Sequence, residues 1–112
     1  MATFTIQKIT NAGIIPTFSA VASDGDLIPN ADGKTFIYAK NTGASDVIIK
    51  ATAITPCDYG EYHSMSETVS ATTGEMAIAL SKRLNTGGNI SLTYEGSVSG
   101  LTLAAFNYPG TL

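Results

Sequence analysis

The sequence is poor in charge and in the side chains that enzymes and metal sites use. Only 13% of its 112 residues are Asp, Glu, Lys or Arg, whereas about 25% is usual for a globular domain. It contains one cysteine, Cys57, and one histidine, His63. A single cysteine excludes an intrachain disulfide, and these two side chains are too few for the four N or S ligands of a typical zinc site. We therefore expect no metal and no cofactor, and we interpret Cys57 as a buried, inert thiol.

Basic side chains are few and scattered. The chain has six Lys and Arg against nine Asp and Glu, a formal net charge of −3, and only Lys82 and Arg83 are adjacent. Because phosphate groups are bound by clustered Lys and Arg, we expect no nucleic-acid partner and no anionic membrane surface as a partner. No uninterrupted apolar run approaches the roughly 18 residues of a membrane helix. The start, Met1–Ile6, lacks the basic region and apolar run of a signal peptide.

The surroundings of the single histidine do not form a recognisable catalytic pattern. Glu61, Ser64 and Ser66 are near His63 in the sequence, but no nucleophile-elbow motif surrounds them. A hydrolase needs a nucleophile, a base and an orienting carboxylate that meet in space. We therefore predict that the chain is not an enzyme and has no catalytic residue, and we interpret His63 as a loop residue exposed to solvent or at an interface.

Two turn-rich segments, 24–26 and 30–33, weakly resemble calcium-binding loops. An EF-hand loop needs oxygen ligands at alternate positions and a closing Glu. Ile28 and Lys34 occupy positions where such ligands would be needed. Ordinary turn chemistry therefore explains these residues better than calcium binding does.

Strand patterns dominate the sequence, and the strongest is Gly33–Gly43. Aromatic and basic side chains alternate there with small or β-branched ones, which is the period-two pattern of a sheet strand. Apolar residues occupy both parities, so we expect a central strand covered on both faces. The spacing to the next strand pattern, Asp46–Thr55, suggests a hairpin. A second hairpin is expected between the alternating segments 90–95 and 101–106.

Shorter patterns complete an all-β domain that spans residues 1–112. We expect further strands at Phe4–Ile9, Ile14–Val21, which Pro16 places near an edge, and Thr68–Ala71. Glu75–Leu84 fits either one stripe of a short helix or a buried strand, and we assign it as a strand with an irregular C-terminal part. About seven or eight short strands with regular turn signals are typical of an antiparallel β-sandwich or a jelly-roll-like barrel.

Several loop and N-terminal side chains are candidates for a protein–protein interface. Exposed tyrosines give large, rigid contact areas, although loop tyrosines equally cap the ends of a core. Phe4 and Ile6 belong either to the first strand or to an N-terminal docking strand or arm within residues 1–10. The candidate binding residues are Phe4, Ile6, Tyr59, Tyr62, His63 and Tyr108.

The run Asp32–Asn41, followed by Val47–Ile49, resembles a group of small virion proteins of tailed bacteriophages. In those proteins an Asn/Asp-Gly-basic-Thr-Phe start leads into a strand that ends in Lys-Asn. The segment Asn89–Gly96 and then Leu101–Ala105 resemble the strands that close the same domain, so the similarity extends from about Asn30 to Phe106. The chain departs from this group at 56–66, which is richer in tyrosine, and at 75–83, which lacks a proline-rich segment.

The resemblance implies a structural protein, above all a capsid decoration (cement) protein that binds the outside of the phage head and stabilises it. The implied partner is the major capsid protein, and the implied state is a homo-oligomer, trimer or dimer, on the capsid lattice. Such a protein is made in the bacterial host cytoplasm and ends on the capsid surface of the virion. Two alternatives stay open: a tail or head–tail connector component, and a carbohydrate-binding β-sandwich that uses Tyr59, Tyr62 and Tyr108 as stacking platforms.

Overall fold

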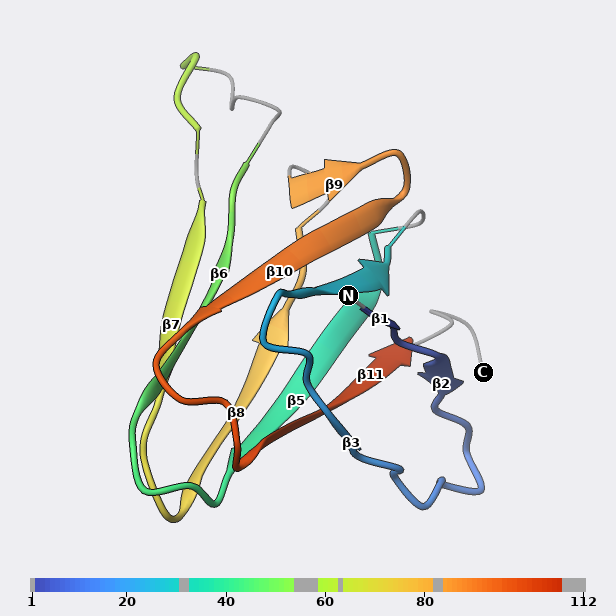
Figure 1. The fold of residues 1–112 in the computed structure, drawn as a ribbon. Helices are drawn as coiled ribbons and strands as arrows, with labels where there is room; N and C mark the ends of the chain where they lie inside the picture. Colours follow the sequence, from blue (N-terminus) through green and yellow to red (C-terminus); the bar gives the residue numbers. More distant parts are fainter. Residues whose placement is uncertain (1, 31–32, 54–58, 63, 82–83, 108–112) are drawn as a thin grey trace.

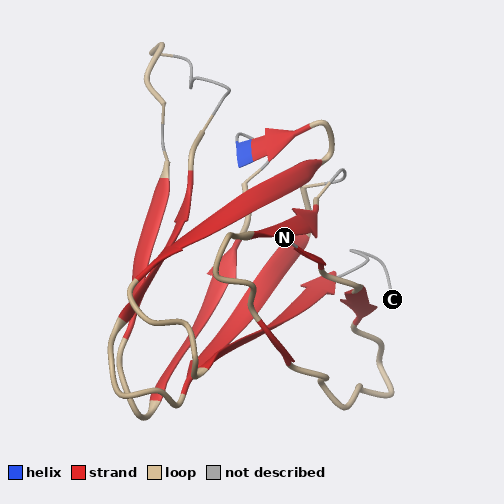
Figure 2. Cartoon of the chain, in the orientation of Figure 1, coloured by secondary structure: helices blue, strands red, loops and turns tan. Residues whose placement is uncertain are grey.

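The computed structural model describes residues 2–30, 33–53, 59–62, 64–81 and 84–107, which form two β-sheets packed face to face (Figure 1). Figure 2 shows strands throughout these ranges, with only a single short helical turn at Leu84. The predicted all-β sandwich of short strands is therefore confirmed. In the described ranges no helix is long and apolar enough to cross a membrane.

The first sheet has strands of two to seven residues, most of them antiparallel. Its order is β1 (Ala2–Thr3), β4 (Asp26–Pro29), β10 (Asn89–Glu95), β6 (Val47–Ala51) and β7 (Met65–Val69), with β9 (Asn85–Thr86) also paired to β10.

The second sheet covers the inner face of the first. Its order is β2 (Ile6–Lys8), β11 (Leu101–Asn107), β5 (Thr35–Asn41) and β8 (Gly74–Ala79), with β3 (Ser19–Ala20) also paired to β11. The N-terminal strands are the two that pair in parallel, β1 with β4 and β2 with β11.

Both predicted hairpins are wrong. β5 pairs with β11 and β8, whereas β6 pairs with β10 and β7 in the opposite sheet. In the same way β10 and β11 follow each other in the chain but lie in different sheets. A strand with alternating apolar residues buries one of its two faces in either arrangement. The next strand in the sequence can pair with it in the same sheet, or it can lie across the core in the opposite sheet. The pattern therefore could not distinguish a hairpin from an arch.

Close backbone packing holds these arched connections together at one end of the sandwich, the lower end in Figure 1. A Cβ atom added to Gly100 would lie 2.2 Å from the backbone nitrogen of Gly43, and one added to Gly74 would lie 2.0 Å from the carbonyl oxygen of Ser70. The N–H of Thr42 donates to the carbonyl of Gly100 at 3.0 Å. Only glycine allows such approaches, because any side chain would collide with fixed backbone.

β5 is an internal strand, as its pattern predicts, but it is fully covered on one face only. Its odd-numbered residues are buried between the sheets, whereas Phe36, Tyr38 and Lys40 on the other face are partly exposed. This corrects the prediction of a strand covered on both faces. The reason is that the outer face is overlaid only in part by the chain leading to β3, whose Phe18 ring contacts Tyr38.

Two buried asparagines mark the ends of β5. The side-chain amide of Asn41 donates to the carbonyl oxygens of Ser45, at 2.8 Å, and Val69, at 3.1 Å, and its oxygen accepts from the N–H of Gly43 at 3.0 Å. Asn30, directly after β4, makes a similar set of bonds at the opposite end, where its oxygen accepts from the N–H of Thr35, the first residue of β5. These side chains replace the main-chain partners that the strand ends lose, so the connections between sheets leave few polar groups unpaired.

The remaining strand predictions differ from the structure mainly in length. Of the predicted strand Ile14–Val21, only Ser19–Ala20 pairs with a neighbour, and Ile14 and Ile15 are exposed. The ambiguous segment Glu75–Leu84 is a strand as far as Ala79, as the strand assignment predicted. Seven of the described strands have four or more residues, namely β4, β5, β6, β7, β8, β10 and β11.

Candidate interaction surfaces

The N-terminal candidates, Phe4 and Ile6, are built into the sandwich. Residues 2–8 run from the first sheet to the second, and the N–H of Phe4 donates to the carbonyl of Leu27 at 2.9 Å. Phe4 is only 9% exposed and belongs to the core, while Ile6 is partly buried against that core. In the single chain these two side chains therefore stabilise the fold, and little of Phe4 is left for a partner.

The loop candidates Tyr59 and Tyr62 are strongly exposed. Both lie in segment 59–62, between β6 and β7, and this segment lies beyond the sandwich at the top of Figure 1, well away from β1 and β2. Tyr59 is 93% exposed and Tyr62 is 60% exposed. Of the other sequence candidates, His63 and Tyr108 lie outside the described residues, as does Cys57. The structure thus separates the predicted residues into an inward pair and an outward pair.

An aromatic cluster on the outer face of the second sheet was not predicted as a site. The rings of Phe18 and Tyr38 meet edge to face with centroids 6.0 Å apart, and the Lys40 ammonium lies 4.4 Å from the Phe18 centroid. The hydroxyl of Tyr38 donates to Glu75 at 2.7 Å, which raises the pKa of Tyr38 above its usual value. The shared parity of residues 36, 38 and 40 is the sequence signal that could have revealed this face.

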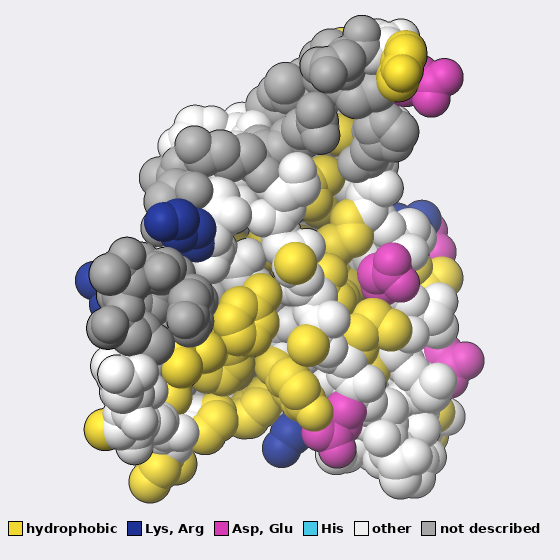
Figure 3. Space-filling view, turned by 180° about the vertical axis from the view of Figure 1, so that it is seen from behind, with side chains coloured by type: hydrophobic (Ala, Val, Ile, Leu, Met, Phe, Trp, Pro, Cys, Tyr) yellow, Lys and Arg dark blue, Asp and Glu magenta, His cyan; other side chains and the backbone are white. Residues whose placement is uncertain are grey.

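Hydrophobic side chains also gather on the side of the molecule shown in Figure 3. Among the described residues, the large hydrophobic side chains that are most exposed are those of Ile15, Tyr59, Tyr62 and Ile14. They belong to two different connections, β2–β3 and β6–β7. Isolated exposed apolar residues are normal, but several on projecting loops are typical of contact elements.

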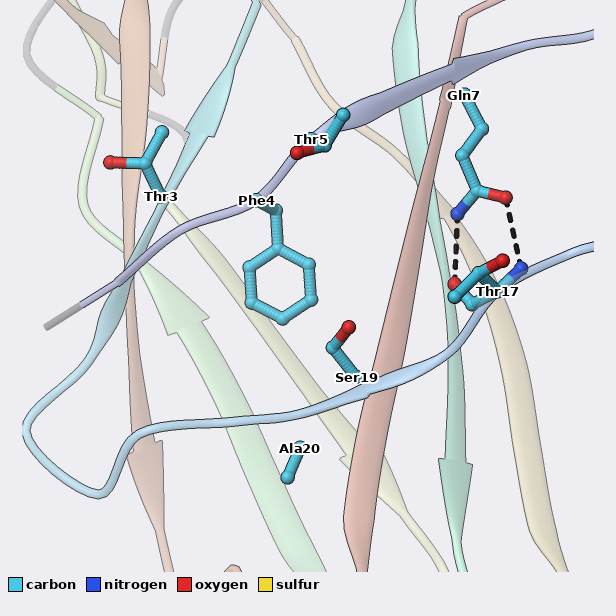
Figure 4. A pocket seen from close by; sticks show the side chains of 7 residues that line it. All are labelled: Thr3, Phe4, Thr5, Gln7, Thr17, Ser19 and Ala20. Carbon is cyan, nitrogen blue, oxygen red and sulfur yellow. Dashed lines mark hydrogen bonds between the residues drawn. The ribbon is translucent and has the colours of Figure 1, made fainter.

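A cavity of about 480 Å³ lies between the N-terminal segment and the chain leading to β3 (Figure 4). Gln7 bridges its two walls, since its amide donates to the carbonyl of Thr17 at 2.8 Å and accepts from the N–H of Thr17 at 2.9 Å. The lining offers hydroxyl groups and one aromatic ring but no titratable side chain. Its residues are Thr3, Phe4, Thr5, Gln7, Thr17, Ser19 and Ala20.

A buried acidic side chain lies inside the first sheet. Asp26 is 0% exposed, and its Oδ2 accepts hydrogen bonds from the Tyr94 hydroxyl at 2.7 Å and from the N–H of Ala22 at 3.0 Å. Burial, followed by the hydrogen bond to Asp26, raises the pKa of Tyr94 far above its usual value. Asp26 thus serves the core, and in the described part of the chain no three His, Cys, Asp or Glu side chains are grouped to hold a metal ion.

Comparison of the chain with protein-family models, with curated proteins and with solved structures gives no match.

Proposed function

We propose that this chain is a bacteriophage structural protein, a capsid decoration protein that binds the outer surface of the head and stabilises it. The observation that carries the proposal is the projecting segment 59–62, on which Tyr59 and Tyr62 are exposed to 93% and 60%. The resemblance of residues 30–106 to small phage virion proteins supplies the biological setting. The strands that carry the resemblance, β5, β6, β10 and β11, all belong to the confirmed β-sandwich.

The physical basis of such a function is repetition. Buried aromatic anchors contribute most of the free energy of a protein interface, and each of the two tyrosines offers a rigid ring with a polar hydroxyl. A single small contact binds weakly, but many copies on one lattice multiply the stabilisation. The partner in this proposal is the major capsid protein, and the protein acts on the virion surface after synthesis in the host cytoplasm.

The first test is the copy number of the chain in purified particles of the phage that encodes it, measured by quantitative mass spectrometry against the major capsid protein. A copy number comparable to that of the shell protein is expected. A handful of copies per particle would instead indicate a tail or connector component. Absence from particles would overturn the proposal and favour a soluble binding module, such as a carbohydrate-binding sandwich.

A second test uses the purified chain and shells that lack it. Tyr59→Ala and Tyr62→Ala should each weaken binding by about 30-fold, because truncating an aromatic anchor costs about 2 kcal/mol. The control is Ile15→Ala, which removes a side chain as exposed as that of Tyr59 from the β2–β3 connection, outside the interface proposed here, and should leave the affinity unchanged. Equal affinities for the wild type and both tyrosine variants would remove the β6–β7 connection from the interface.

A further inference from the structure

We propose that the outer edge of β8 pairs with β8 of a second copy of this chain, forming a two-fold dimer with one continuous sheet. The proposal adds an interface to the homo-oligomer of the proposed function and does not depend on the identity of the partner shell.

β8 is the long, unprotected edge of the sandwich. It pairs with β5 on one side, and no described strand pairs with it on the other. Natural sheets usually shield their edges by shortness, charge or proline. β8 has six residues, and between Glu75 and Leu80 it contains only Met, Ala and Ile.

The other outer strands carry such protection. β7 has Glu67 at its centre, β2 has three residues and ends in Lys8, and β1, β3 and β9 have two residues each. Among the described strands β8 is therefore the least protected edge, since its one charge, Glu75, lies near its start, and this favours pairing there.

The direction of the main-chain groups in β8 follows from its register with β5. Leu80 donates its N–H to the carbonyl of Thr35 at 3.1 Å, one step beyond the pair formed by Phe36 and Ala79. In an antiparallel pair alternate residues point their N–H and C=O groups toward the partner. Even-numbered residues of β8 therefore face β5, and the main-chain groups of Glu75, Ala77 and Ala79 face outward.

This spacing is self-complementary. In an antiparallel pairing centred on Ala77, each Ala77 faces its copy, and Glu75 faces Ala79 of the other chain. The three outward residues would then exchange roughly six main-chain hydrogen bonds across the two-fold axis. No like charges oppose each other, and the exposed side chains at the axis are only methyl groups.

The inner side of the same pairing is apolar. Met76 is partly buried against the core and Ile78 is 8% exposed. In the proposed register Met76 of one chain faces Ile78 of the other, so the two cores join across the dimer. Side chains directly opposite each other on one face of a sheet are in contact, so this pairing would bury apolar surface. The match of register, charge and apolar contacts is the reason for choosing a second copy as the partner.

The test is a charge swap at the axis, measured by light scattering coupled to size-exclusion chromatography. The wild type should elute with about twice the 11.6 kDa mass of one chain. Ala77→Glu and Ala77→Lys should each halve that mass, because two like charges would face each other, whereas an equimolar mixture of the two variants should regain the dimer. The matched control, Thr93→Glu, alters an exposed residue in the middle of the first sheet and should remain dimeric.

Circular dichroism of each variant verifies the fold, and the exposed position of Ala77 makes either charge compatible with it. A monomeric wild type, dimeric single variants, or a mixture that stays monomeric would each overturn the proposal. A monomer that is abundant in particles would refute this interface and leave the proposed function standing. A dimer that is absent from particles would refute the proposed function and leave this interface standing.

Discussion

Asn30 is the residue whose replacement tests the account of the fold most directly. Its side chain is 1% exposed. The amide donates to the carbonyl of Leu80 at 3.1 Å and to Oδ1 of Asn85 at 3.0 Å, and the amide oxygen accepts from the N–H of Thr35 at 3.1 Å. Asn30→Ala removes all of these bonds at once and deprives the buried N–H of Thr35 of its acceptor. The variant therefore lacks a side chain that links strands of both sheets.

The expected loss of stability can be worked from these contacts. A buried hydrogen bond contributes about 1 kcal/mol net, and a buried donor left unpaired costs about 1–3 kcal/mol. Asn30→Ala should therefore lower the free energy of unfolding by about 3–5 kcal/mol, a large part of the roughly 5–15 kcal/mol of an ordinary domain. With a urea dependence of about 1–3 kcal/mol per molar, the midpoint should fall by about 2 M.

The assay is urea unfolding followed by far-ultraviolet circular dichroism at neutral pH. Asn11→Ala, at an exposed turn residue, is the control and should change stability by no more than about 0.5 kcal/mol. Asn30→Asp keeps the shape of the side chain but, when ionised, offers only acceptors to Leu80 and Asn85. It should destabilise at least as much as Asn30→Ala. A loss below about 1 kcal/mol for Asn30→Ala would refute the claim that this side chain joins the two sheets.

Two further changes test other parts of the molecule. The raised pKa of Tyr94 means that its contribution to stability is complete below about pH 10, the usual pKa of a tyrosine, and is lost above it, by about 1.4 kcal/mol per pH unit. Tyr94→Phe should therefore reduce the decline of the urea midpoint at alkaline pH. It should also lower the free energy of unfolding by about 1–3 kcal/mol at neutral pH, because the hydrogen bond to Asp26 is lost. An unchanged alkaline decline would contradict the burial of that hydroxyl. Gly100→Ala places a Cβ atom 2.2 Å from the backbone of Gly43 and should lower the melting temperature sharply, with a loss above about 2 kcal/mol. Gly13→Asn is its control, since nothing lies within 4 Å of a Cβ at that position and asparagine tolerates the positive φ of 78° better than other side chains do. Equal melting temperatures for the two variants would show that Gly43 and Gly100 do not pack closely.

The candidate residues show which environments the sequence pattern could predict and which it could not. Tyr59 and Tyr62 were expected in a polar loop, and their exposure follows from that position. Phe4 and Ile6 fit a docking arm and an edge strand equally well as a pattern, because both need apolar residues at alternate positions. Asp26 belongs to a turn-like stretch of sequence, and only its contact with Tyr94, 68 residues away, reveals that it is a core residue.

The same limit applies to β8. Its apolar run fits a helix stripe, a buried strand or an edge strand, and the sequence supports the strand reading only through its strand-forming neighbours. The pairing of β8 with β5 decides that β8 is an outer strand and which of its main-chain groups face outward. Register is a property of two strands, so one strand's sequence does not contain it.

The sequence by itself determined the all-β class, the places of the main strands and the lack of clustered charge. These features are local, since alternation and turn residues act over a few positions. Only the tertiary structure decided which sheet each strand joins and that β5–β6 and β10–β11 are arches instead of hairpins. The deciding contacts, Gly43 with Gly100 and Asn30 with Leu80, join residues that are 50 or more positions apart. Local pattern cannot encode which distant backbone a glycine or an asparagine will meet.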